Sequence, residues 1–177
     1  RWLMRLAEWG VGACLADDMG LGKTIQGLVL LDARRKLGPA LVVAPASVTR
    51  NWLRETERFA PKLNAHLLHT SKDMDWVKDL GPEDLLLVSY GLLPFAEEVL
   101  TEKVFDTIIL DEAQAIKNRA TKRSKIVMKL QAEFRVATTG TPIENHLIDL
   151  YAIVEFLYPN MLTPLWEFSY QHCYFDT

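Results

Sequence analysis

The chain alternates short, almost continuous apolar runs with longer stretches in which apolar residues recur at helical spacing. The apolar runs lie at residues 12–16, 40–44, 63–68, 85–88, 105–110 and 134–138. Helical spacing covers residues 2–9, 23–37, 48–59, 72–79, 91–101 and 121–130, and a last helix runs from Thr141 or Asn145 to Leu157. Continuous apolar strands joined by helices indicate βαβ units. The pattern therefore predicts an α/β fold, with a mostly parallel sheet that has helices on both faces.

Polar clusters follow most of the apolar runs directly. The clusters are Pro45-Ala-Ser47, Ser89-Tyr90, Asp111-Glu-Ala-Gln114 and Thr139-Gly-Thr141, together with the glycine-rich loop that ends at Thr24. In parallel sheets, ligands bind beyond the carboxyl ends of the strands, where these loops gather. Their common position predicts one functional site along this edge of the sheet. Ser47 also stands where the N-cap of the following helix is expected.

The segment from Leu15 to Thr24 reads Leu-Ala-Asp-Asp-Met-Gly-Leu-Gly-Lys-Thr and joins a predicted strand to a predicted helix. This order is typical of a P-loop, in which glycine N–H groups and a helix N-terminus bind a polyphosphate. We expect Lys23 to reach the β- and γ-phosphates and the Thr24 hydroxyl to hold Mg²⁺. One position departs from the usual spacing, because Asp17 stands where a glycine or alanine is usual. A glycine turn followed by a chance Gly-Lys-Thr is the structural alternative.

Asp111 and Glu112 end the most hydrophobic predicted strand, where a carboxylate is costly unless a positive charge compensates it. Mg²⁺ shared with Thr24 and a nucleotide phosphate is the natural partner of Asp111. Glu112 is placed to orient or deprotonate an attacking water. An exposed acidic turn after a strand is the simpler alternative for the pair taken alone. We expect the fold to bring the loop at 20–24 and this pair to neighbouring strand ends, around one hydrated magnesium triphosphate.

Composition and charge narrow the class of protein further. The 177 residues are 49% hydrophobic and 24% charged, with a net charge of −3, as in an ordinary globular domain. No apolar run approaches the roughly 20 residues that a membrane-spanning helix needs. The net charge argues against binding nucleic acid through overall charge, whereas a local basic track is compatible with it. Cys14 and Cys173 are far apart and fit no metal site or disulfide framework, so a reducing compartment is expected.

Five motifs occur in order along the chain: Asp-Asp-Met-Gly-Leu-Gly-Lys-Thr, Val-Ala-Pro-Ala-Ser, Asp-Glu-Ala-Gln, Ile-Lys-Asn and Thr-Gly-Thr-Pro-Ile-Glu-Asn. Their combination resembles the first RecA-like lobe of a Swi/Snf-type ATPase of helicase superfamily 2, and the resemblance runs from end to end. It implies a single P-loop NTPase lobe over residues 1–177, with ATP as substrate and Mg²⁺ as cofactor. It also implies a second RecA-like lobe, duplex DNA as partner, and ATP-driven movement along DNA that remodels DNA-bound complexes. The Asp17 departure is shared with the family.

Matched position by position, the resemblance implies a role for each motif. The phosphate loop is Asp18, Met19, Gly20, Leu21, Gly22, Lys23 and Thr24. Asp111 is expected to hold the metal together with Thr24, and Glu112 to act on the water. Gln114 would sense the nucleotide, although the family more often has histidine there. Thr139, Gly140 and Thr141 resemble the motif that couples nucleotide state to lobe movement. Thr141-Pro-Ile-Glu144 also fits a helix capping box, and the two interpretations are compatible.

Contacts to nucleic acid are expected from hydroxyl groups, helix N-termini and basic side chains that meet a phosphate backbone. The candidates are Ser47, Ser89, Lys117 and Arg119, then Lys122, Arg123, Lys125 and Lys129 on the same basic stretch, and Arg50, Arg54 and Arg58 on another helix. A solvated helix face, with Ile126, Val127 and Leu130 turned inward, is the structural alternative for the basic stretch. Such contacts would be independent of DNA sequence and strongly dependent on salt.

Two other functions remain open from the sequence. A nucleotide-gated binding module would bind ATP without productive hydrolysis, although both catalytic carboxylates are present. An RNA-remodelling helicase of the same superfamily is suggested by Asp-Glu-Ala-Gln, whereas the phosphate loop and Thr-Gly-Thr-Pro-Ile-Glu-Asn favour the Swi/Snf type. The motifs do not specify whether nucleosomes, a stalled polymerase or another complex is remodelled. We expect a soluble intracellular protein, in the nucleus of a eukaryote or in the cytoplasm and nucleoid of a bacterium.

We predict that these 177 residues by themselves bind magnesium-ATP weakly and hydrolyse it at or near the background rate. The chain opens on Arg1 within a predicted helix, so we expect it to be part of a longer protein. By resemblance, the arginine fingers lie in a second lobe and the adenine-reading glutamine motif lies before Arg1. Hydrolysis depends on these groups because it relies on positioning and charge stabilisation. A phosphate-release assay with and without duplex DNA checks this, and robust DNA-stimulated turnover would contradict it.

Overall fold

The computed structural model describes residues 2–16, 22–69, 74–140 and 147–172. The strands are β1 (Ala13–Leu15), β2 (Ala40–Ala44), β3 (Asn64–Leu67), β4 (Asp84–Ser89), β5 (Val104–Leu110) and β6 (Gln131–Thr138). The α-helices are α1 (Trp2–Glu8), α2 (Lys23–Arg34), α3 (Ala46–Phe59), α4 (Glu97–Glu102), α5 (Lys122–Lys129), α6 (Leu147–Leu157) and α7 (Leu165–His172). Three short 3-10 helices are η1 (Asp75–Asp79), η2 (Leu93–Phe95) and η3 (Ala113–Ile116). Every helix within the described ranges is too short or too polar to cross a membrane.

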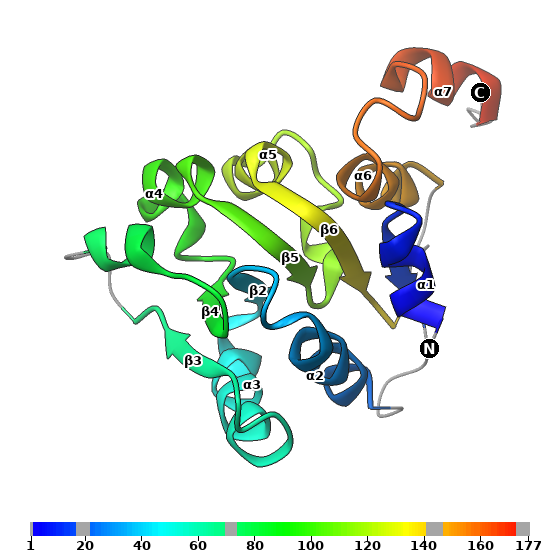
Figure 1. Cartoon of the computed structure of the whole chain (residues 1–177). Coiled ribbons are helices and arrows are strands. Elements are labelled where there is room, and N and C mark those ends of the chain that lie inside the picture. The colour runs from blue at the N-terminus through cyan, green and yellow to red at the C-terminus, as the bar shows by residue number, and fades with distance from the viewer. Residues whose placement is uncertain (1, 17–21, 70–73, 141–146, 173–177) are drawn as a thin grey trace.

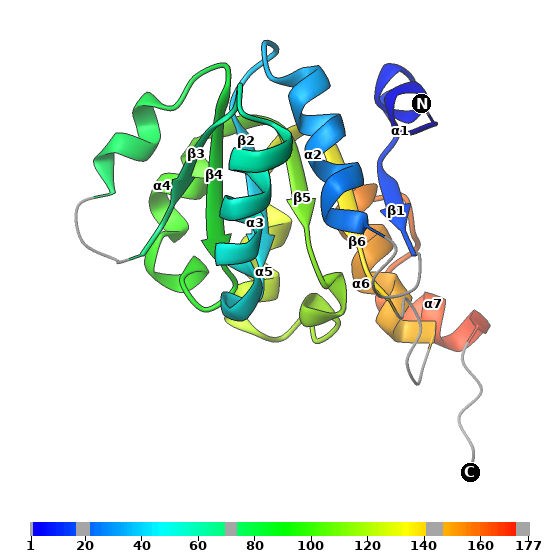
Figure 2. The same ribbon diagram turned by 90° about the horizontal axis from the view of Figure 1, so that it is seen from below.

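The strands form one sheet in the order β1-β6-β5-β2-β4-β3, and every pair of neighbours is parallel. Helices α1, α2 and α3 lie on one face of this sheet, and α4, α5 and α6 lie on the other (Figure 1). Figure 2 shows α2 and α3 side by side in front of the strands. The predicted α/β fold, with a parallel sheet covered on both faces, is therefore confirmed.

The two-sided cover explains why the central strand β2 is apolar at every position. Consecutive side chains of a strand point to opposite faces of the sheet. Along β2, Leu41 and Val43 belong to the core beneath α4, α5 and α6, whereas Val42 and Ala44 belong to the core beneath α1, α2 and α3. Neither face of β2 is left for polar side chains, so this strand lacks the alternation seen in half-exposed strands. The edge strand β3 differs most from it, since all its residues are exposed or half-buried.

The start of α3 corrects the expectation that Ser47 is its N-cap. The N-cap is Pro45, whose φ of −57° and ψ of 144° lie outside the helical region. Its carbonyl oxygen accepts hydrogen bonds from the N–H groups of Val48 and Thr49. The chain therefore turns into the helix directly after β2, and Ser47 stands in the first turn. No side-chain capping hydrogen bond forms at this N-cap.

The boundaries of several other helices differ from those expected from the sequence, for local reasons. The segment expected to be helical over 91–101 is divided into η2 and α4, because Pro94 at the start of η2 cannot continue an α-helix. Helix α2 ends at Arg34 rather than at 37, and the helix expected over 72–79 is a 3-10 helix from Asp75, with 72 and 73 outside the described residues. The capping box expected at Thr141 also lies outside the described residues.

Helix α7 was not expected; it has no buried residues and stands away from the body of the molecule (Figure 1).

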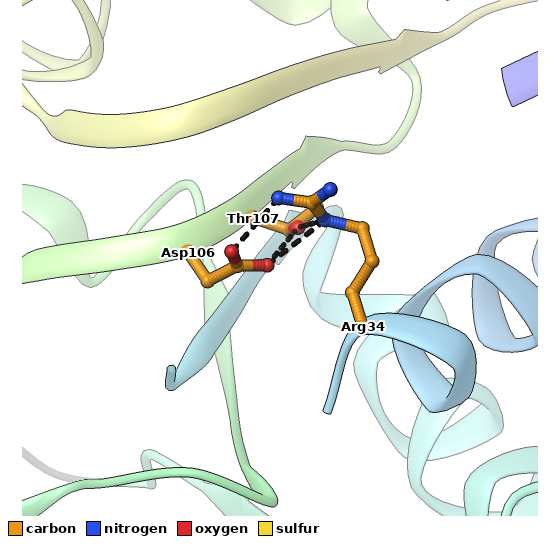
Figure 3. Close-up of polar contacts among 3 residues, drawn as sticks. All are labelled: Arg34, Asp106 and Thr107. Atoms are coloured by element: carbon orange, nitrogen blue, oxygen red, sulfur yellow. Dashed lines mark hydrogen bonds and ion pairs between the residues drawn. The ribbon is translucent and has the colours of Figure 1, made fainter. Parts of the chain in front are cut away.

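The end of α2 is held to the start of β5 by a buried ion pair (Figure 3). Arg34 Nη2 lies 2.8 Å from Asp106 Oδ1, and Arg34 Nε donates to Asp106 Oδ2 at 3.0 Å and to Thr107 Oγ1 at 2.9 Å. The side chains of Arg34 and Asp106 are only 11% and 7% exposed. The guanidinium also lies 5.3 Å from the centre of the Phe134 ring. This contact anchors the C-terminal end of the helix that begins at Lys23.

We predict that Arg34→Ala lowers the free energy of unfolding by about 3 kcal/mol, because it leaves the buried Asp106 carboxylate without its partner. Urea denaturation followed by circular dichroism measures this. Arg58→Ala is the control: its guanidinium is exposed over the Phe59 ring, so a change within about 0.5 kcal/mol is expected. Equal losses in the two variants would show that the Arg34 pair has no special role in stability.

Candidate active site

A cavity of about 350 Å³ lies at the carboxyl edge of the sheet. It is lined by Gly22, Lys23, Thr24, Ile25, Val48, Glu55, Asp111 and Glu112. The fold thus brings the Gly-Lys-Thr end of the glycine-rich loop and the acidic pair together. The expectation of neighbouring strand ends was wrong, because β6 lies between β1 and β5. The two meet because α2 connects β1 with β2, crosses over β6 and β5, and packs on β5.

The first turn of α2 presents a helix N-terminus to this cavity. Its N-cap, Gly22, has a φ of 74°, in the left-handed region that favours glycine, and makes no side-chain capping hydrogen bond. The first backbone N–H groups of a helix have no partner within the helix, and they carry the positive end of its dipole. Lys23 is largely buried beside them, at 9% exposure. This geometry suits an anion. Asp18, Met19, Gly20 and Leu21 lie outside the described residues.

Asp111 follows β5 and is 6% exposed, so its carboxylate depends on hydrogen bonds. Oδ1 accepts from the Thr138 hydroxyl and from the Glu112 N–H at 3.1 Å. Oδ2 accepts from the indole N–H of Trp52 at 2.8 Å. The Tyr90 hydroxyl donates to the backbone oxygen of Asp111 at 2.9 Å. A carboxylate has about four acceptor positions, so these three bonds to its oxygens leave room for a further ligand.

Glu112 begins a chain of hydrogen bonds that leads away from the cavity. Gln114 Nε2 donates to Glu112 Oε2 at 2.6 Å, and Thr139 Oγ1 donates to Gln114 Oε1 at 2.9 Å. The backbone of Glu112 has a φ of 51° and a ψ of 56°, in the left-handed region that is costly for any residue with a Cβ. Such conformations persist where the surrounding structure enforces them, often at functional sites. Gly140 follows Thr139 and is half-buried, and Thr141 lies outside the described residues.

The motif analysis missed two partners of Asp111, Trp52 and Thr138, and included Tyr90 in a polar cluster without predicting its bond to Asp111. Trp52 is fully buried, and a buried indole N–H needs an acceptor. Thr138 is the last residue of β6, which pairs with β5. Burial, together with the Asp111 charge, raises the pKa of Tyr90, so its hydroxyl stays protonated and donates. The requirement that a buried Trp finds a partner was the one signal available in the sequence.

The nucleic-acid candidates do not share one place. Ser47 lines a second cavity, of about 500 Å³, with Arg50, Asn51, Leu53, Arg54, Leu67 and His69. Lys117 and Arg119 line a third, of about 450 Å³, with Asn118, Ala120, Asp149 and Leu165. The Arg119 guanidinium lies 4.9 Å from the centre of the Tyr151 ring. Ser89, at the end of β4, is 8% exposed and offers little surface to a large ligand.

Helix α5 has the solvated basic face that was the alternative interpretation. Ile126, Val127 and Leu130 are buried, whereas Lys122, Arg123, Lys125 and Lys129 are exposed. Lys129 Nζ lies 2.8 Å from Glu97 Oε1.

Cys14 is a half-buried free thiol on β1, and burial raises its pKa, which disfavours the reactive thiolate. Cys173 lies outside the described residues.

Comparison with known proteins places this geometry in a family. The profile of the SNF2-related domain matches residues 1–174. YwqA of Bacillus subtilis is 42% identical over 174 residues, which cover 94% of this chain and 19% of YwqA. The ISWI chromatin-remodeling complex ATPase ISW1 of Saccharomyces cerevisiae is 35% identical over 177 residues, covering 95% of this chain and 16% of ISW1. The Sulfolobus solfataricus SWI2/SNF2 ATPase core in complex with dsDNA superposes with a TM-score of 0.84 at 40% identity, over 96% of this chain and 36% of that one.

The parallel sheet, the helix N-terminus and the acidic pair define a P-loop NTPase lobe of the RecA-like class, as in the SWI2/SNF2 ATPase core. The chain belongs to the SNF2-related domain family. The resemblance to the first lobe of a Swi/Snf-type ATPase is therefore confirmed. The chain spans less than a fifth of the length of these two curated relatives.

We predict that the backbone at Glu112 stores strain that a glycine releases. Glu112→Gly and Glu112→Ala both remove the carboxylate and its bond to Gln114, so their difference reports the cost of a Cβ at a φ of 51° less the greater entropy of glycine in the unfolded chain. The glycine variant should be more stable than the alanine variant by about 1 kcal/mol. Thermal or urea unfolding of the two variants measures this, and an alanine variant of equal or greater stability would contradict it.

Proposed function

We propose that this chain is the first, ATP-binding lobe of a DNA-stimulated ATPase that moves along duplex DNA and remodels DNA-bound protein complexes. The observation that carries the proposal is the single cavity shared by the N-terminus of α2 and the Asp111-Glu112 pair. Membership of the SNF2-related domain family supports it, because the relatives include a chromatin-remodeling ATPase. We assign residues 1–177 to one lobe, which a second RecA-like lobe completes.

The residues around the cavity fit a triphosphate and its metal ion. The α2 N-cap is a glycine with no side-chain capping bond, and a helix N-terminus of this kind suits phosphate oxygens. Glu55 also lines the cavity; its Oε2 is buried without a hydrogen-bond partner among the described residues, while its Oε1 accepts from Asn51 at 3.0 Å. A buried oxygen without a partner can accept a hydrogen bond from a hydroxyl group of a ligand or from a metal-bound water. The lining of the cavity therefore includes both a cationic donor, Lys23, and carboxylate acceptors.

Each residue of the site then has a defined task. Lys23 and the N-terminus of α2 would neutralise the phosphates, and Thr24 and Asp111 would hold Mg²⁺. When bound, the metal ion supplies positive charge that stabilises the phosphate oxygens. Glu112 would orient the attacking water and accept its proton. Gln114 lies between Glu112 and Thr139 in the hydrogen-bond chain, so it would report the state of the site to the segment that begins at Thr139.

Duplex DNA is proposed as the partner, through its phosphate backbone. The similarity to a SWI2/SNF2 ATPase core in complex with dsDNA supports this, at 40% identity. Ser47 and the uncapped first turn of α3 offer hydroxyl and N–H donors, and Arg50 and Arg54 line the cavity beside them. Lys117 and Arg119 form a second proposed contact at a different cavity. Binding through such groups weakens steeply as salt rises.

In the full-length protein, Lys23→Ala and Glu112→Gln should each reduce ATP hydrolysis by about 100-fold or more, because they remove the phosphate cation and the base that acts on water. Lys36→Ala is the control, since Lys36 is exposed after the end of α2, and it should retain the wild-type rate. Steady-state phosphate release in the presence of duplex DNA is the measurement. Unchanged rates in the first two variants would refute the assigned roles.

The same assay distinguishes the other candidate functions. Stimulation by duplex DNA greater than by RNA of equal length supports the DNA translocase, and the reverse order would identify an RNA-remodelling helicase. A wild-type protein that binds ATP but hydrolyses none in the presence of either would instead be a nucleotide-gated binding module.

A further inference from the structure

We propose that Trp52 is a positioning residue of the ATPase site: its indole N–H orients the Asp111 carboxylate for Mg²⁺. The inference rests on the proposed function, since it concerns the residue assigned to hold the metal. Trp52 lies 59 residues before Asp111 in the sequence, on a different element, and no motif pairs the two. Trp52 is not among the residues that line the nucleotide cavity, so it acts through Asp111.

The hydrogen bonds to Asp111 divide unequally between its two oxygens. Oδ1 has two donors, the Thr138 hydroxyl and the Glu112 N–H. Among the described residues, Trp52 is the donor to Oδ2, at 2.8 Å. Three donors from α3, β6 and the backbone after β5 fix the plane of the carboxylate. Without the indole N–H, Oδ2 loses its partner and the carboxylate can rotate, so the lone pairs that face the cavity are no longer held in one direction.

The indole ring of Trp52 is closely packed on α2. Trp52 is fully buried, and its ring packs against α2 at Gly27, one turn after Lys23. A Cβ at Gly27 would lie 2.9 Å from Trp52 Cη2 and 3.2 Å from Ile109 Cδ1, closer than carbon atoms normally approach. The ring is therefore wedged between the phosphate-binding helix and β5. A ring held in this way presents its N–H in one fixed direction, which is what positioning requires.

Helix α3 brings the nucleotide cavity and the basic cavity together. Val48 and Glu55 lie on the same face of the helix as Trp52, and both line the nucleotide cavity. Arg50 and Arg54 line the other cavity, which faces the proposed DNA contact. The bond from Trp52 is thus the direct contact through which the position of α3 sets the orientation of Asp111.

The test is Trp52→Phe in the full-length protein, because phenylalanine keeps an aromatic ring and removes only the donor and part of the ring. The Mg²⁺ concentration for half-maximal ATP hydrolysis should rise about tenfold, and excess Mg²⁺ should restore much of the rate. Mn²⁺ binding in the presence of ADP, followed by electron paramagnetic resonance, should weaken about tenfold without any turnover. A purely structural role of Trp52 would lower the rate without either metal-dependent effect.

Trp76→Phe is the matched control, because it makes the same chemical change at a partly exposed indole on η1, 5.7 Å from the His66 ring centre. It should leave Mg²⁺ dependence and Mn²⁺ binding unchanged. Gly27→Ala is the second variant: it displaces the wedged ring but leaves both Trp52 and Asp111 in the chain. It should raise the Mg²⁺ requirement in the same direction, which keeps the inference testable if Trp52→Phe does not fold.

Wild-type Mg²⁺ dependence in folded Trp52→Phe would overturn the inference and leave the proposed function intact, provided that Asp111→Asn still abolishes Mn²⁺ binding. Equal loss of Mn²⁺ binding in Trp76→Phe would also overturn it, because the effect would not be specific to the bond with Asp111. Wild-type Mn²⁺ binding in Asp111→Asn would refute the proposed function, and the inference with it.

Discussion

A nearly buried carboxylate at the end of a hydrophobic strand is the constraint on which this site depends. Asp111 is 6% exposed, and an ionised carboxylate in such a place costs several kcal/mol unless other groups compensate it. Trp52, Thr138 and the Glu112 N–H supply hydrogen bonds from three separate parts of the chain. These donors carry no full charge, so they orient the carboxylate without neutralising it. A cation in the adjoining cavity would complete the compensation, which links the stability of this edge to ligand binding.

The order of the strands in the sheet brings the N-terminus of α2 and Asp111 to the same cavity. Because β1 and β2 are separated by β6 and β5, the helix that joins them must cross both strands, and its N-terminus comes to the cavity that Asp111 lines. The same helix is held at its other end by Arg34, which pairs with Asp106 at the start of β5. One strand therefore carries the anchor at its beginning and the carboxylate at its end.

Much of this was predictable from local pattern, and the errors in element boundaries were local too. Continuous apolar runs identified the strands, since a strand covered on both faces has no polar side, and residues 40–44 correspond to β2 as observed. Gly22, Lys23 and Asp111 were chosen from residue type and position alone, and the fold brings them into one cavity. Boundaries failed where a proline intervened: Pro45 caps α3 in place of Ser47, and Pro94 divides the helix expected after β4.

The sequence by itself determined the periodicity of each element, the parallel class of sheet, and the chemistry at the strand ends, because these follow from neighbouring residues. Only the tertiary structure decided that β6 lies between β1 and β5, that Trp52 donates to Asp111, and that Thr139 reaches Glu112 through Gln114. Each of these joins residues distant in the chain. Periodicity shows which face of an element is buried, but the partner on that face depends on strand order and crossing direction, which arise when the whole core packs.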